Sequence, residues 1–226
     1  MKSIFNRVLS SIRNSTVTPE KARKKLEEMG VSTSSVWGYR NDPEKVRLFL
    51  VAGGRVDESD VYWTISEGWV ESVALMLQCP GLDINGRYSV DTLLTRAIKK
   101  RQIAIVALLL ASPGIDVNLK DSGTSGYSPL YIAAESGQSE IVALLLSTSG
   151  IDVNSGFGQY SPLHAAARKG RVDCVRLLLN AKGIKVEDGH VRAAGGHDLC
   201  AQMILAKKNS ILNRLRKVGE FFRDSW

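Results

Sequence analysis

The sequence predicts an all-α fold, a solenoid of helix-turn-helix units with loop or β-hairpin fingers between them. Three observations support this prediction. The stretch from Tyr160 to Leu179 has the pattern of two short helices separated by a glycine. Similar stretches recur upstream at intervals of about 33 residues, and the connectors between them recur as well. Because one such hairpin is too small to bury its own apolar face, stacked neighbours are required.

Local chemistry explains each part of this hairpin. Ser161 can cap the first helix, and Pro162 stands at the first helical position, where a missing N–H group costs nothing. Gly170 suits the turn between the helices, because a backbone with positive φ is expected there. The second helix places four apolar side chains on one face, Cys174, Val175, Leu178 and Leu179.

The pattern repeats at offsets of 33, 36 and 33 residues towards the N-terminus. The matching first helices are at residues 128–134, 92–97 and 59–65, and the connectors at 81–85, 114–118 and 150–154. The run Ser161-Pro162-Leu163-His164-Ala165-Ala166 resembles the signature of the ankyrin-repeat family, which also has a period of about 33 residues. The resemblance implies an ankyrin-repeat solenoid capped by irregular N- and C-terminal helices.

This register divides the chain into segments. We expect an ankyrin-repeat domain at 19–206, between a basic amphipathic segment at 1–18 and a basic capping helix at 207–226. Within the domain we predict a helical cap at 19–30, an irregular repeat at 31–58, repeats at 59–91, 92–125, 126–158 and 159–187, and a degenerate repeat at 188–206. Thr18 and Gly30 bound the cap helix, and a short helix is expected from Ser34 to Arg40. This leader resembles those of bacterial ankyrin proteins.

The two ends leave alternatives open. The N-terminal segment can form a helix docked on the solenoid, a basic helix on a membrane surface or a partner, or a cleaved targeting segment. The C-terminal segment can cap the solenoid or remain an exposed basic amphipathic helix.

Charge and composition narrow the function. The formal net charge is +7, but residues 1–30 and 205–226 each carry +4, which leaves −1 for the body between them. A nucleic-acid partner is therefore not expected, because such binders place a basic stripe on the folded face. The three cysteines form no disulfide framework, and no run is long enough for a membrane span. We expect a cytoplasmic, reducing location, with delivery into another cell or peripheral membrane association as alternatives.

Catalytic and metal-binding patterns are weak. His164 stands at the ankyrin signature position, and the resemblance implies a structural role through hydrogen bonds that brace the finger. His197 and Cys200 can share a helical face, but a zinc site normally needs four ligands and no further pair is evident. We therefore predict no enzyme activity, no cofactor and no metal site.

The resemblance also implies where a partner binds, since ankyrin proteins usually use the finger tips and the inner face of the first helices. By register, the finger residues are Tyr88, Asp91, Tyr127, Phe157 and Tyr160. The residues on the inner helical face are Lys99, Lys100, Glu135, Arg168 and Lys169. Charge on this face alternates in sign from repeat to repeat, which favours a protein partner of mixed surface charge.

These observations give two hypotheses. The first is a non-enzymatic interaction module, monomeric alone, which acts as an adaptor or inhibitor by binding a folded protein through its concave face and finger tips. The alternative is a membrane-peripheral adaptor or a secreted bacterial effector that uses the basic terminal helices.

Overall fold

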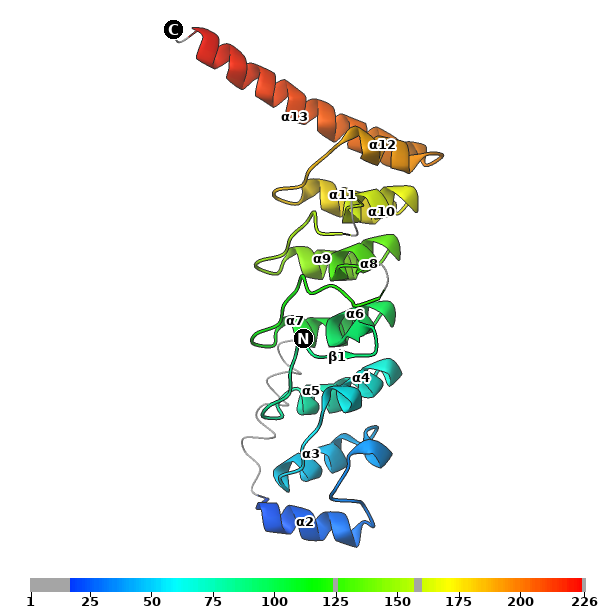
Figure 1. The fold of residues 1–226 in the computed structure, drawn as a ribbon, viewed down its shortest axis with the longest axis vertical. Helices are drawn as coiled ribbons and strands as arrows, with labels where there is room; N and C mark the ends of the chain where they lie inside the picture. The colour runs from blue at the N-terminus through cyan, green and yellow to red at the C-terminus, as the bar shows by residue number, and fades with distance from the viewer. Residues whose placement is uncertain (1–16, 124–125, 157–159, 225–226) are drawn as a thin grey trace. The chain divides into compact units, whose positions relative to one another are not determined.

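The computed structural model describes residues 17–123, 126–156 and 160–224, with side chains as far as Arg214 (Figure 1). The predicted all-α class is confirmed, since the described residues are mostly helical. The chain forms two compact units, Met1–Thr124 and Ser125–Trp226. Most of the predicted amphipathic segment at 1–18 lies outside the described residues.

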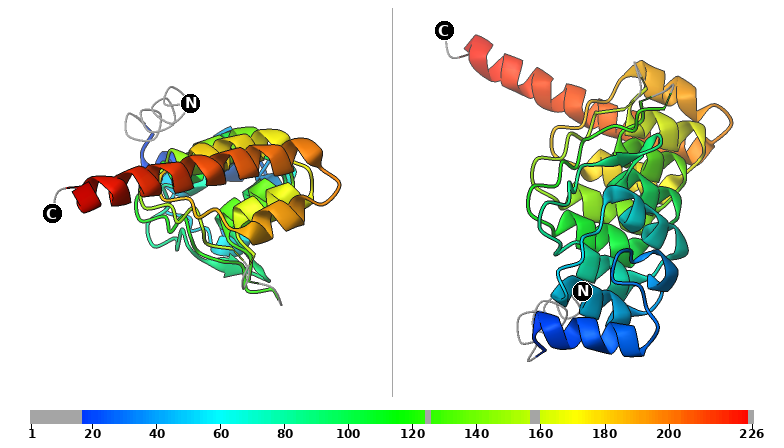
Figure 2. Two further views of the ribbon diagram at one scale, coloured as in Figure 1. Left: turned by 90° about the horizontal axis from the view of Figure 1, so that it is seen from above. Right: turned by 60° about the horizontal axis from the view of Figure 1, so that its bottom comes forward.

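Unit 1 consists of helices and one short hairpin. In chain order these are α2 (Pro19–Glu28), the 3-10 helix η1 (Trp37–Tyr39), α3 (Pro43–Val51), α4 (Glu58–Glu67), α5 (Val70–Met76), β1 (Arg87–Tyr88), β2 (Asp91–Thr92), α6 (Leu93–Lys99) and α7 (Ile103–Leu110). The first helices α4 and α6 pack together, and the second helices α3, α5 and α7 pack in a row. Helix α2 packs on α3 and covers that end of the unit (Figure 2).

Side-chain caps start the helices of unit 1. Thr18, Asp57 and Thr92 each accept a hydrogen bond from the backbone N–H three residues further on, which satisfies a donor that the helix leaves unpaired. Gly68 ends α4 at a φ of 78°, a conformation that glycine adopts without a steric penalty.

The helix expected from Ser34 to Arg40 is shorter than predicted, because only the single turn η1 forms. The serine hydroxyls before it bond to nearby backbone instead. Ser32 Oγ accepts from the N–H of Ser34, and Ser35 Oγ accepts from the N–H of Trp37. Such local bonds compete with the helical pattern and favour turns.

One finger of unit 1 is a β-hairpin. Strands β1 and β2 pair antiparallel, with Arg87 opposite Thr92 and Tyr88 opposite Asp91. Ser89 makes the turn at a φ of 61°. The N–H of Ser122 donates to the carbonyl of Val90 at 2.8 Å, so the next finger is attached to this hairpin.

Unit 2 continues the same construction. It contains α8 (Pro129–Glu135), α9 (Ser139–Leu146), α10 (Pro162–Arg168), α11 (Val172–Asn180), α12 (Asp188–Ala194) and α13 (Asp198–Asp224). First helix α10 packs against α8 and α12, and second helix α11 packs against α9 and α13. The four apolar residues predicted to share one face of the second helix, Cys174, Val175, Leu178 and Leu179, are all buried.

Helix α13 joins two segments that the sequence separated. The boundary drawn at 206/207 falls inside it, because no glycine or proline interrupts the chain from Asp198 to Val218. Ile204 is fully buried, whereas Leu205 and Leu212 are exposed. The first part of the helix therefore completes the last hairpin, while the rest extends past it (Figure 2).

The repeated connectors join neighbouring repeats through asparagine side chains. In unit 1, Asn85 donates to the carbonyl of Gly114 and accepts from the N–H of Asp116. In unit 2, Asn154 donates to the carbonyl of Gly183 and accepts from the N–H of Lys185. The connector motif therefore has a structural role.

Candidate functional site

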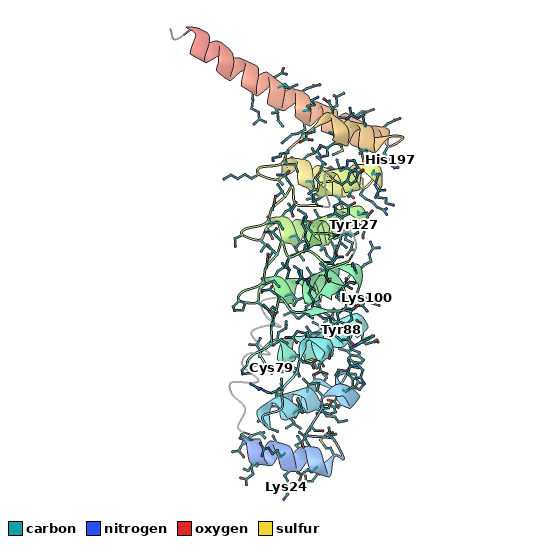
Figure 3. The ribbon with its side chains drawn as sticks, viewed as in Figure 1. Lys24, Cys79, Tyr88, Lys100, Tyr127 and His197 are labelled. Carbon is teal, nitrogen blue, oxygen red and sulfur yellow. The ribbon has the colours of Figure 1, made fainter. Side chains whose placement is uncertain are left out.

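The finger residue Tyr88 lies in an exposed aromatic cluster of unit 1, formed with Trp37, Tyr62 and Trp63 and called here the tryptophan cluster. The ring of Trp63 is central, with its centroid 6.3 Å from Trp37, 5.7 Å from Tyr62 and 6.2 Å from Tyr88, all edge to face. Trp37 is 51% exposed, Trp63 36% and Tyr88 37%. Figure 3 labels Tyr88 at the side of the stacked helices.

Two arginines stack on this cluster. The guanidinium carbon of Arg40 lies 3.6 Å from the ring centroid of Trp37, and that of Arg96 lies 4.4 Å from the centroid of Tyr62. Arg40 Nε also donates to the carbonyl of Trp37 at 3.1 Å, and Arg96 Nε donates to Ser66 Oγ at 2.8 Å. Because these contacts restrain the rings, less side-chain entropy would be lost when a partner binds them.

The indole N–H groups of the two tryptophans take no part in the hydrogen bonds of the described residues. An exposed indole combines a large apolar face with a donor, a combination that is common at protein interfaces.

Asp91 and Lys99 were predicted to contact a partner, but the structure places them in a network at the base of the fingers. Lys99 Nζ lies 2.6 Å from Asp91 Oδ1 and 2.9 Å from Asp121 Oδ2. The two carboxylate side chains are 5% and 4% exposed, and Tyr62 Oη donates to Asp91 at 3.4 Å. Asp91 is therefore a buried scaffold residue and not a finger-tip contact.

The network also changes the titration of Lys99. Burial lowers the pKa of its ammonium group, but the hydrogen bonds and charges of Asp91 and Asp121 outweigh burial and raise the pKa above its ordinary value. The charged form is thus favoured, and Lys99 joins the hairpin finger to the next one.

Glu135 and Arg168, predicted with opposite charge on the inner face of unit 2, neutralise each other. Arg168 Nη2 lies 2.8 Å from Glu135 Oε1, and Arg171 Nε donates to the carbonyl of Glu135 at 3.2 Å. The alternation of charge between these repeats is partly satisfied inside the protein. By contrast, Lys100 and Lys169 are exposed and form no ion pair with another described residue.

Unit 2 contains a pocket of about 260 Å³ lined by Tyr127, Tyr131, Tyr160, His164 and Arg168, called here the tyrosine pocket. Tyr127 stacks on Tyr131 with ring centroids 4.8 Å apart and planes within 3° of parallel. One repeat later, Tyr160 packs on His164 with centroids 4.5 Å apart. Burial, with the positive charge of Arg168 and the proximity of His190, lowers the pKa of His164 and favours its neutral form.

Comparison with known proteins agrees with this geometry. Residues 120–189 match the family model for ankyrin repeats, which spans three copies. This part of the chain is built of ankyrin repeats. A crystal structure of the ankyrin repeat protein EF0377 is similar, with a TM-score of 0.58 and 23% identity, covering 65% of this chain and 80% of that one. At this identity the similarity concerns the fold. No curated protein matches the chain.

In this ankyrin array the expected bracing by His164 is carried out by another histidine. No ring hydrogen bond joins His164 to a described residue. Instead, buried His190 lies with Nε2 2.9 Å from Ser161 Oγ, while its Nδ1 accepts from the N–H of Glu187 at 2.9 Å. Since Nδ1 accepts, Nε2 carries the proton and donates to Ser161.

The described residues hold no group of three or more His, Cys, Asp or Glu side chains that could bind a metal ion. His197 is exposed and Cys200 is buried. None of the described helices is both long and apolar enough to cross a membrane. Phe157 lies outside the described residues, so its role at a finger tip stays a prediction.

Sequence reasoning missed part of both aromatic clusters. The predicted contact residues did not include Trp37, Tyr62, Trp63 or Tyr131, because these four lie within helical segments and not on fingers or at the ends of the first helices. The repeat register contains a usable signal, since Tyr62, Tyr131 and His164 occupy the same repeat position. Within unit 2, the stacking of successive repeats brings the rings of Tyr131 and His164 into one pocket.

Proposed function

We propose that this ankyrin-repeat protein is a binding module whose tryptophan cluster anchors a folded protein partner, as an adaptor or an inhibitor of that partner. Ankyrin repeats are generally protein–protein interaction modules. The observation that carries the proposal is the joint exposure of Trp37, Trp63 and Tyr88 on one face. Tryptophan and tyrosine dominate the energetics of protein interfaces, and clustered apolar exposure on a soluble protein marks interaction sites.

Charge around the cluster supports a partner of mixed surface charge. Glu67 and Lys100 are both exposed, and they stand at the ends of the adjacent helices α4 and α6 with opposite charge. Arg96 adds a positive charge where it stacks against Tyr62. A surface that carries both positive and negative charges orients the partner as it associates, and contributes less to the affinity itself.

The proposal is tested by comparing what the protein and its variants capture from a native-cell lysate. Trp37→Ala combined with Trp63→Ala should reduce the captured partner at least about 30-fold, the effect of losing a hot spot worth about 2 kcal/mol or more. Mass spectrometry of the bound fraction measures this loss, and circular dichroism checks that the variant is folded.

Ile103→Ala is the matched control. Ile103 is 38% exposed at the start of α7, outside the tryptophan cluster, so its truncation should leave capture unchanged. A bound fraction that is identical for the wild type and the double variant would refute the proposed site.

A further inference from the structure

The tyrosine pocket is built from equivalent positions of two successive repeats. Tyr127 and Tyr160 stand just before the two first helices, and Tyr131 and His164 stand one helical turn inside them. Tyr131 is only 3% exposed, whereas Tyr160 is 38% exposed. The pocket therefore has a buried aromatic floor and an accessible aromatic rim.

Its size fits a single side chain. The volume of about 260 Å³ lies below the range of about 300–1,000 Å³ that is usual for drug-sized ligands and cofactors. Aromatic walls on both repeats favour a planar guest, because rings gain from offset stacking and edge-to-face contact beyond their buried area.

Charge selects against a cationic guest. Arg168 lines the pocket and carries a fixed positive charge, while its salt bridge with Glu135 uses the nearest carboxylate. The neutral form of His164 is favoured by burial and by Arg168. An arginine or lysine side chain would enter beside the positive charge of Arg168, and none of the five residues that line the pocket is a carboxylate.

We propose that the tyrosine pocket receives one uncharged aromatic side chain, a tyrosine or a tryptophan, from the protein partner. The inference rests on the proposed function. It adds a second contact, besides the tryptophan cluster, and specifies the chemistry of the partner's side chain there. The guest's hydroxyl or indole N–H meets polar atoms of His164, Arg168 and the tyrosines. An aliphatic guest would remove these atoms from water without satisfying them.

The test uses the purified, isotope-labelled full chain and defined probes, read by amide chemical shifts in nuclear magnetic resonance. N-acetyl-tyrosinamide and N-acetyl-tryptophanamide should give saturable shifts at residues 127–131 and 160–168, with a dissociation constant in the millimolar range typical of fragments. N-acetyl-leucinamide and N-acetyl-argininamide should bind at least about fivefold more weakly.

Variants locate the binding. Tyr160→Ser removes an exposed rim ring and should weaken the aromatic amides at least about fivefold, whereas Tyr160→Phe should retain them. Leu199→Ser, at a 53% exposed position of α13 in the same unit, should bind the amides as the wild type does.

Several outcomes would overturn the inference. These are the absence of saturable shifts, equal binding of the leucine and aromatic amides, tighter binding of the arginine amide, or tighter binding of adenosine monophosphate, which would indicate a nucleobase site. Capture from the lysate tests binding through the tryptophan cluster of unit 1, whereas this titration measures amide chemical shifts in unit 2. Failure of one is therefore distinguishable from failure of the other.

Discussion

Single side chains of this protein have roles that their repeat position does not reveal. Lys99 and Lys100 are neighbours at the end of α6, and both were assigned to the binding face. Lys99 turns to two buried carboxylates, while Lys100 stays exposed. The difference arises because Asp91 and Asp121 come from two fingers that meet beside one of the two lysines.

This contrast gives the first prediction. Lys99→Met removes the ammonium group that lies between the buried carboxylates of Asp91 and Asp121, although Arg96 still lies 3.8 Å from Asp91. The free energy of unfolding should fall by about 2 kcal/mol, allowing for the partial exposure of the lysine. Denaturant unfolding followed by circular dichroism measures the change.

Lys100→Met is the control for the lysine network. Because Lys100 is exposed and pairs with no described residue, its replacement should change the unfolding free energy by less than about 0.5 kcal/mol. Equal effects of the two substitutions would show that the network adds nothing to stability.

At the scale of the helix pair, the turn between α6 and α7 departs from the other repeats. Arg101 occupies the position taken by Gly68, Gly137 and Gly170, and it has a φ of 58°. An L-residue with a side chain pays a steric cost in this left-handed conformation, while glycine does not.

Arg101→Gly should therefore raise the free energy of unfolding by about 0.5–1 kcal/mol, the relief of strain less the greater freedom of glycine in the unfolded chain. Thermal or denaturant unfolding is the measurement. Arg101→Ala keeps the steric conflict and should give no gain. A glycine variant less stable than the wild type would mean that the arginine side chain makes a favourable contact that outweighs the strain.

For the whole molecule, the distribution of charge matters more than its sum. The net charge of +7 is concentrated in the two ends, and the repeat body between them carries −1. Affinity for a nucleic acid depends on cations that neutralise phosphates together along one surface. We expect the dissociation constant for a short duplex DNA to be higher than about 100 µM at physiological salt. Fluorescence anisotropy of a labelled duplex provides the test, and micromolar affinity with a steep salt dependence would contradict it.

Much of the fold could be predicted because its signals are local. The helix caps at Thr18, Thr92 and Ser161 and the turn glycines act within one or two helical turns. The helix expected from Ser34 to Arg40 was too long, because serine hydroxyls compete for the backbone N–H groups. The boundary predicted at 206/207 falls inside α13, because nothing breaks that helix there.

The candidate site was predictable only in part. Register placed Tyr127 and Tyr160 on fingers and Arg168 on the inner helical face, and the structure brings the three together in one pocket. It did not indicate that Arg168 would pair with Glu135, since a side chain's direction depends on its rotamer and on neighbours 33 residues away.

The sequence by itself determined the repeat period, the all-α class, the helix starts and the turns, because capping, glycine conformation and apolar periodicity are properties of short segments. Only the tertiary structure decided which side chains are available to a partner. Asp91 lies 30 residues from Asp121, and Trp37 lies 26 residues from Trp63, so their contacts depend on how repeats stack. Stacking buried one predicted contact residue, paired two charges with each other, and assembled the exposed tryptophans into a cluster.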